Sequence, residues 1–110
     1  MLIYDIPPNW RYENIAGPSI LCRDKTETVI YALKKNYNLK PINIEAILGD
    51  SLIVSYFNEN NFNTLRIEIY NNLEISALII NEKECETIHV EAVYDLNFEN
   101  VMKKFFEPTS

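Results

Sequence analysis

Positions that suit a buried helical stripe recur in the first third of the chain. They follow the i, i+3, i+4, i+7 spacing of an amphipathic helix at Cys22, Thr26, Val29, Ile30, Leu33 and Tyr37. Ser19 stands where a residue can cap the amino terminus, and the pattern stops near Asn38, before Pro41. The spacing therefore predicts one helix over residues 19–38.

The segment before this helix has a different pattern. Pro7-Pro8 favours polyproline-like geometry in its neighbours, and Gly17-Pro18 marks the end of the segment. We expect residues 1–17 to form an extended arm that Trp10 and Tyr12 fix to the rest of the protein.

After Pro41 the apolar period switches from a helical spacing to two, which is typical of strands. Alternating runs cover residues 42–48, 52–57, 65–70, 74–80 and 87–93, and short polar segments rich in Asn separate them. A last helix is expected from Asn97 as its cap, with one apolar stripe of Phe98, Val101, Met102 and Phe105. The predicted fold is α+β, a helix followed by a five-stranded antiparallel meander and a C-terminal helix, in one domain over residues 1–110.

The register of the strands can be tested by parity, because residues opposite each other in an antiparallel pair share a face. A three-residue loop of Asn71, Asn72 and Leu73 keeps the apolar residues of its two strands together. Such a loop needs a residue with positive φ, which Asn tolerates. By the same parity Gly49, Asp50 and Ser51 are expected to join the first two strands. The predicted pairs are Ile69 with Ile75, Ile67 with Ala77, and Leu65 with Ile79.

These pairings give the sheet two unlike faces. The face expected beneath the helices carries Ile44, Ala46, Val54, Tyr56, Leu65, Ile67, Ile69, Ile75, Ala77, Ile79, Ile88, Val90 and Ala92. The predicted opposite face mixes large apolar groups with charges, and it carries Glu45, Ile47, Ile53, Ser55, Phe57, Arg66, Glu68, Tyr70, Ser76, Leu78, Ile80, His89 and Glu91. This mixture is too apolar for a sheet face that only meets water.

Three interpretations of the mixed face remain open. The N-terminal arm or the last helix covers it, the face pairs two copies of the chain, or it binds a different protein. In the third case Phe57, Arg66 and Tyr70 would be the anchors, because aromatic residues and arginine carry much of the energy of protein interfaces. What distinguishes them is where the two termini lie.

Charge and composition restrict the class of partner. Sixteen acidic residues against ten Lys and Arg give a net charge of −6, so the whole chain repels phosphate backbones, and direct nucleic-acid binding is disfavoured. An acidic surface suits a basic protein partner instead. The 47% apolar content fills one core, and no stretch has the length of a membrane span. Met1 to Ile6 is too short for a signal peptide and contains Asp5, so we expect a cytoplasmic protein with Cys22 and Cys85 reduced.

The residue types that catalysis requires are scarce. His89 is the only histidine, which excludes paired-histidine metal motifs, and the two glycines form no phosphate-binding loop. The predicted register sets His89 in one row with Leu78, Arg66, Ser55 and Glu45, and it sets Glu68 and Glu91 in another. We therefore predict a protein that is not an enzyme, with no catalytic residue, cofactor or metal site.

One stretch of the sequence resembles a known group. Pro8-Asn9-Trp10, Pro18-Ser19 at a helix start, and the unit Leu65 to Ile79, with Ile67-Glu68-Ile69-Tyr70, are similar to small uncharacterised bacterial α+β proteins with a Trp-bearing N-terminal arm, a helix and an antiparallel meander. The likeness covers about residues 8–93 and departs at Leu73, where a glycine would suit the turn. It implies the α+β layout and a bacterial or phage origin, and it implies no activity.

The leading hypothesis is a non-catalytic protein-interaction domain of the antitoxin, immunity or inhibitor kind, which binds a basic protein partner. The predicted contact residues are Glu45, Ile53, Phe57, Arg66, Glu68, Tyr70, Leu78, His89 and Glu91. One alternative is a homodimeric accessory or structural subunit. Another is a small-ligand binder or minimal enzyme that uses His89 with Glu68 and Glu91.

Overall fold

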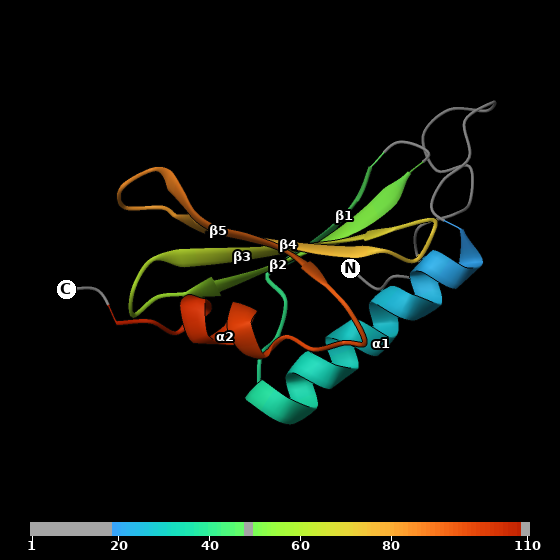
Figure 1. Ribbon diagram of the computed structural model, residues 1–110, viewed down its shortest axis with the longest axis horizontal. Helices are drawn as coiled ribbons and strands as arrows, with labels where there is room; N and C mark the ends of the chain where they lie inside the picture. The colour runs from blue at the N-terminus through green and yellow to red at the C-terminus, as the bar shows by residue number, and fades with distance from the viewer. Residues whose placement is uncertain (1–18, 48–49, 109–110) are drawn as a thin grey trace.

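Two helices lie on one side of a five-stranded antiparallel sheet (Figure 1). The computed structural model describes residues 19–47 and 50–108, so the predicted arm of residues 1–17 lies outside the described residues. The elements are α1 (Ile20–Tyr37), β1 (Asn43–Ile47), β2 (Ser51–Asn58), β3 (Asn63–Tyr70), β4 (Ile75–Asn81), β5 (Glu86–Val93) and α2 (Glu99–Phe105). The strands are neighbours in chain order from β1 to β5. This arrangement confirms the α+β fold and the order of elements that the sequence predicts.

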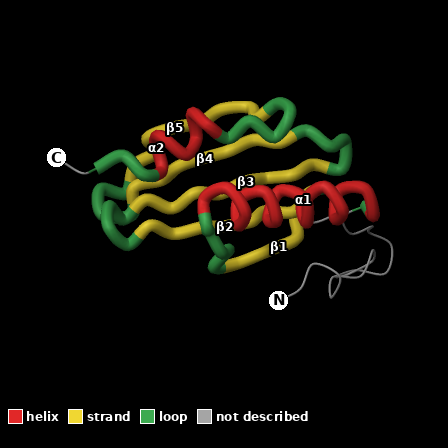
Figure 2. Tube along the Cα trace, turned by 90° about the horizontal axis from the view of Figure 1, so that it is seen from below, coloured by secondary structure: helices red, strands yellow, loops and turns green. Residues whose placement is uncertain are grey.

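Helix α1 begins and ends where the sequence signals place it. The Ser19 hydroxyl accepts a hydrogen bond from the Cys22 amide at 3.1 Å, which satisfies one of the unpaired donors of the first turn. Asn38 adopts the left-handed conformation that ends many helices, with φ of 55°. Cys22, Val29 and Leu33 are fully buried, so the predicted stripe faces the sheet. Figure 2 shows α1 lying across β2 and β3.

Helix α2 covers the other half of the same sheet face (Figure 2). It begins at Glu99, one residue later than a cap at Asn97 predicts, although the Asn97 side chain still accepts from the Glu99 amide at 3.1 Å. At its carboxyl end, the Asn61 amide group donates to the carbonyls of Phe105 and Glu107 at 2.8 and 2.9 Å. The Asn-rich connection between β2 and β3 therefore satisfies helix carbonyls that would otherwise lack donors.

The β3–β4 hairpin has the predicted register. Ile69 pairs with Ile75, and the three-residue loop between them closes through hydrogen bonds from the amides of Leu73 and Tyr70. The residue with positive φ is Leu73, at 71°, rather than either asparagine. A non-glycine residue in this region is strained because its Cβ crowds the following carbonyl. The sequence pattern thus predicts the pairing correctly and leaves open which residue takes the strain.

The connection between β1 and β2 differs from the prediction. Ile47 pairs with Ser51, so Ser51 is the first residue of β2 and not part of the loop, and residues 48 and 49 lie outside the described residues. Glu45 consequently faces Ile53, a shift of two positions from the expected register. A shift of two leaves every side chain on its predicted face, because the side-chain period of a strand is two.

Strand β5 is where the predicted faces are wrong. Near the hairpin, Ile80 pairs with Thr87, as parity predicts, but Ile79 pairs with His89, which leaves Ile88 as an extra residue in β5. This β-bulge moves the rest of the strand by one position, and a shift of one exchanges its two faces. His89 and Glu91 therefore lie on the helix side, whereas Val90 and Ala92 lie on the opposite side with exposed side chains. Ile88 is exposed as well.

Candidate functional site: the outer face of the sheet

The face of the sheet opposite the helices is the candidate interaction surface, and we call it the outer face. Both α1 and α2 lie on the other side, so neither covers it (Figure 1). The register gives it Asn43, Glu45, Ile47, Ser51, Ile53, Ser55, Phe57, Thr64, Arg66, Glu68, Tyr70, Ser76, Leu78, Ile80, Thr87, Val90 and Ala92. Seven of the nine predicted contact residues are on this face. The interpretation in which the last helix covers it is wrong, and the one in which the arm covers it concerns residues outside the described part.

An ion pair crosses the outer face above β2. Arg66 in β3 donates from Nη2 to Oε1 of Glu45 in β1 at 3.0 Å, and β2 runs between these two strands. The bridge passes over the stretch that holds Ile53 and Ser55, which are each 7% exposed. Both charged side chains are partly exposed, so the pair contributes no more than about 1 kcal/mol to stability. Its effect is to set the position of one charge of each sign on this surface.

Glu68 lies beside this bridge and carries a second negative charge. Its carboxylate accepts from the Ser51 hydroxyl at 2.5 Å and from the Tyr70 hydroxyl at 3.0 Å. Among the described residues no lysine or arginine pairs with it. Arg66 is the one basic side chain on the described outer face, and Glu45 already pairs with it. The β1–β3 half of the outer face therefore holds one carboxylate that is fixed by two hydroxyl groups and has no cationic partner within residues 19–47 and 50–108.

The β4–β5 half of the outer face is apolar. Leu78 and Ile80 are partly buried there, next to Val90, which is 66% exposed, and to the exposed Ala92. Tyr94 follows directly after the strand and is 74% exposed. The alternation of the sequence predicts that Val90 and Ala92 are buried in the core, and this prediction is wrong. The alternation of β5 gives no signal for the bulge that turns them outward.

His89 and Glu91 form a separate pair on the helix side. They are hydrogen-bonded to each other through Nε2 and Oε1, and both are partly exposed. Glu68 lies on the other side of the sheet, and its row continues through Ser76 to Ala92 rather than to Glu91. The predicted row that joins Arg66 and Leu78 to His89 is also wrong, since Leu78 pairs with Val90. The three residues proposed for a minimal enzyme thus do not converge on one site.

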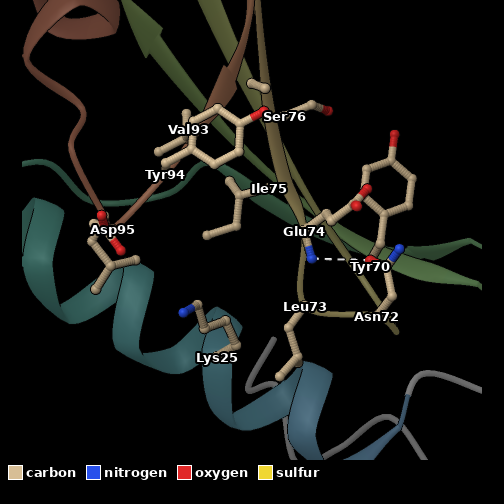
Figure 3. A pocket seen from close by; sticks show the side chains of 12 residues that line it. Lys25, Tyr70, Asn72, Leu73, Glu74, Ile75, Ser76, Val93, Tyr94 and Asp95 are labelled. Atoms are coloured by element: carbon tan, nitrogen blue, oxygen red, sulfur yellow. Dashed lines mark hydrogen bonds between the residues drawn. The ribbon is translucent and has the colours of Figure 1, made fainter.

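A hollow of about 470 Å³ lies where the β3–β4 turn and the end of β5 approach α1. Figure 3 shows Lys25 pointing into it from α1, with Glu74 and Asp95 on its rim and Ile75 and Tyr94 on its far side. One ammonium group and two carboxylates line it, and this combination does not indicate which class of ligand the hollow would bind. Within residues 19–47 and 50–108, no group of three or more His, Cys, Asp or Glu side chains is placed to hold a metal ion.

Fold and surface together define the class: a two-layer α+β domain with both helices on one side of an antiparallel meander and a mixed ionic and apolar outer face. In the described part of the chain no helix is long and apolar enough to cross a membrane. Comparison with protein families, with curated proteins and with solved structures finds no match for this chain.

Proposed function

We propose that the protein is a non-catalytic interaction domain that binds another protein through the outer face of its sheet. The observation that carries this proposal is the pairing of Glu68, whose charge is uncompensated, with large apolar side chains on a face that neither helix covers. Interfaces of this kind combine a central apolar area with a few fixed polar groups. Phe57, Arg66 and Tyr70 are the anchors that the geometry offers.

The partner that fits this face is basic. The chain has a net charge of −6, and the charges of Glu45 and Arg66 on the outer face cancel, which leaves Glu68 as the group that seeks a cation. Complementary charge raises association rates and excludes acidic partners. An antitoxin, immunity protein or inhibitor of bacterial or phage origin, acting in the cytoplasm, would neutralise its partner in this way by covering a basic site.

The test is affinity capture from the native host with the wild-type protein, a Glu68→Arg variant and a Tyr31→Arg variant. Tyr31 is an exposed residue of α1 on the other side of the molecule, so the same change there is the matched control. We expect the wild type and the control to retain one basic protein, and we expect Glu68→Arg to bind it at least about tenfold more weakly. Glu68→Gln removes the charge and keeps an oxygen that can accept a hydrogen bond, so this variant separates the effect of the charge from that of the hydroxyl contacts.

Two results would contradict this proposal: capture of no partner by the wild type, or equal retention by Glu68→Arg. Circular dichroism of each variant shows whether it folds. The alternative of a homodimeric module rests on a different feature, the exposed edge of β5. The alternative of a ligand site made of His89, Glu68 and Glu91 has less support, because the sheet separates Glu68 from the other two.

A further inference from the structure

The two edges of the sheet are protected to different degrees. Strand β1 has five residues and follows Pro41, whereas β5 has eight residues and contains neither proline nor lysine. Figure 2 shows these two strands at opposite edges. Natural proteins usually protect an edge strand by making it short, by placing charges, proline or a β-bulge in it, or by covering it, because its unpaired backbone groups accept another strand. Within the described residues β5 is the longer edge strand, and its protection is limited to the bulge at Ile88 and the charges of Glu86 and Glu91.

The side chains of β5 make this edge self-complementary. In an antiparallel pair of two β5 strands centred on Val90, His89 of each copy faces Glu91 of the other, and Ile88 faces Ala92. The two Val90 side chains then meet at the twofold axis. The imidazole of His89 then lies beside a carboxylate with which it can form a hydrogen bond, and apolar side chains face apolar side chains, in the arrangement that stabilises cross-strand pairs.

Neighbouring registers do not have this property. Centring the pair on Glu91 sets two carboxylates opposite each other, which is destabilising. Centring it on His89 sets Glu91 opposite Thr87 and loses both contacts between His89 and Glu91. A shift of a single position pairs outward residues with inward ones, which would bury His89 against Val90. The register centred on Val90 is therefore selected by the sequence of the strand.

We propose that β5 pairs with β5 of a second copy of this chain, in antiparallel register about Val90. Two sheets of five strands then join into one of ten, and the two outer faces become continuous. The exposed Val90 and Ala92 side chains of each copy lie beside those of the other. In this register residues 87–93 of one strand lie opposite the same residues of the other in reverse order, so the bulge residue Ile88 is part of the pairing and lies opposite Ala92. This inference goes beyond the proposed function, since it concerns the edge of the sheet and a copy of the same chain.

A disulfide cross-link tests the register directly. Residues at the axis of an antiparallel pair have Cα atoms about 4.5–5.5 Å apart, within the range of about 4.4–6.8 Å that a disulfide allows. In a Cys85→Ser background, which removes the exposed native thiol, Val90→Cys is expected to form a covalent dimer under mild oxidation. Ala92→Cys is the matched control, because the two Ala92 residues would lie about 14 Å apart, four residues along the strand.

Sedimentation over a dilution series up to about 1 mM measures the association itself. Wild type and Ile42→Lys are expected to dimerise with the same dissociation constant, and Val90→Lys is expected to raise it at least about 100-fold by placing two ammonium groups at the axis. Ile42 is the control because it is 65% exposed at the opposite edge of the sheet, and Val90 is 66% exposed. Thermal melts establish that each variant folds.

Three outcomes would overturn the edge pairing: a wild type that is monomeric throughout the series, a Val90→Lys variant that dimerises as tightly as the wild type, or an Ala92→Cys protein that cross-links as readily as Val90→Cys. None of these bears on capture of a different protein through Glu68. Conversely, a wild type that captures no partner but cross-links through Val90→Cys retains the edge pairing and removes the proposed function.

Discussion

Tyr56 is the largest fully buried side chain of the core, and its hydroxyl group has no hydrogen-bond partner among the described residues. A hydroxyl group that is buried without a partner costs about 1–3 kcal/mol relative to one in water. Tyr56→Phe removes this oxygen and keeps the ring. The void that it leaves is smaller than a methyl group, and such a void costs less than about 1 kcal/mol. We therefore expect the substitution to raise the free energy of unfolding by about 1 kcal/mol.

The ionisation of the same side chain adds a pH dependence. Burial raises the pKa of Tyr56 well above its ordinary value of 10.0, because the charged phenolate is poorly solvated in the core. The unfolded chain releases this proton near pH 10, and the folded chain keeps it to higher pH. The stability linked to this group is therefore complete below about pH 10, and it is lost as the pH rises through the folded-state pKa, by up to about 1.4 kcal/mol per pH unit.

Urea unfolding followed by far-ultraviolet circular dichroism, at neutral pH and above pH 10, measures both effects. The advantage of Tyr56→Phe over the wild type is expected to grow with pH in the alkaline range. Tyr70→Phe is the contrasting variant, since the Tyr70 hydroxyl donates to Glu68 at 3.0 Å, and we expect it to lose about 1 kcal/mol. A Tyr56→Phe protein less stable than the wild type by 1 kcal/mol or more would refute the reasoning, because the hydroxyl would then have a favourable contact in solution.

Two further predictions concern other positions. The Cys22 thiol is fully buried, donates to the Ile69 carbonyl at 3.1 Å, and has a pKa that burial raises. At neutral pH a thiol reagent should therefore modify Cys85 alone in the native protein and both cysteines in urea. Rapid modification of two thiols without urea would show that the packing of α1 on the sheet is loose. Leu73→Gly relieves the strain of a positive φ at an exposed turn and is expected to raise the free energy of unfolding by up to about 1 kcal/mol. If urea unfolding instead shows a less stable variant, the packing of the leucine side chain outweighs the strain.

The sequence predicts those parts of the fold that local signals determine. Ser19 and Asn38 mark the two ends of α1 because their side chains and conformations suit helix ends. The parity of Ile69 and Ile75 selects one loop length for the β3–β4 hairpin. The loop before Ser51 is displaced by two positions because either register leaves the same residues in the core. Parity distinguishes registers that differ by one residue and cannot distinguish those that differ by two.

The candidate site was predictable to the same extent. Residues of β1 to β4 such as Glu45, Arg66 and Leu78 lie on the face that alternation assigns to them. His89 and Glu91 do not, because one extra residue at Ile88 inverts the rest of β5. The contact between Arg66 and Glu45 joins two strands that are not adjacent, and the pairing of neighbouring strands alone does not predict it.

The bulge changes which side chains of β5 are buried, and this changes the free energy that the strand contributes to folding. Without it, Val90 and Ala92 would lie beneath the helices, and the strand would gain the free energy of burying apolar surface, roughly 25 cal/mol per Å². With it, the strand places His89 and Glu91 on the helix side, where they remain partly exposed and pair with each other, so the free-energy cost of desolvating them is small. The apolar side chains then face outward at the edge of the sheet, and none of the described residues covers Val90, which is 66% exposed. A second β5 strand would cover these side chains and satisfy the free backbone groups.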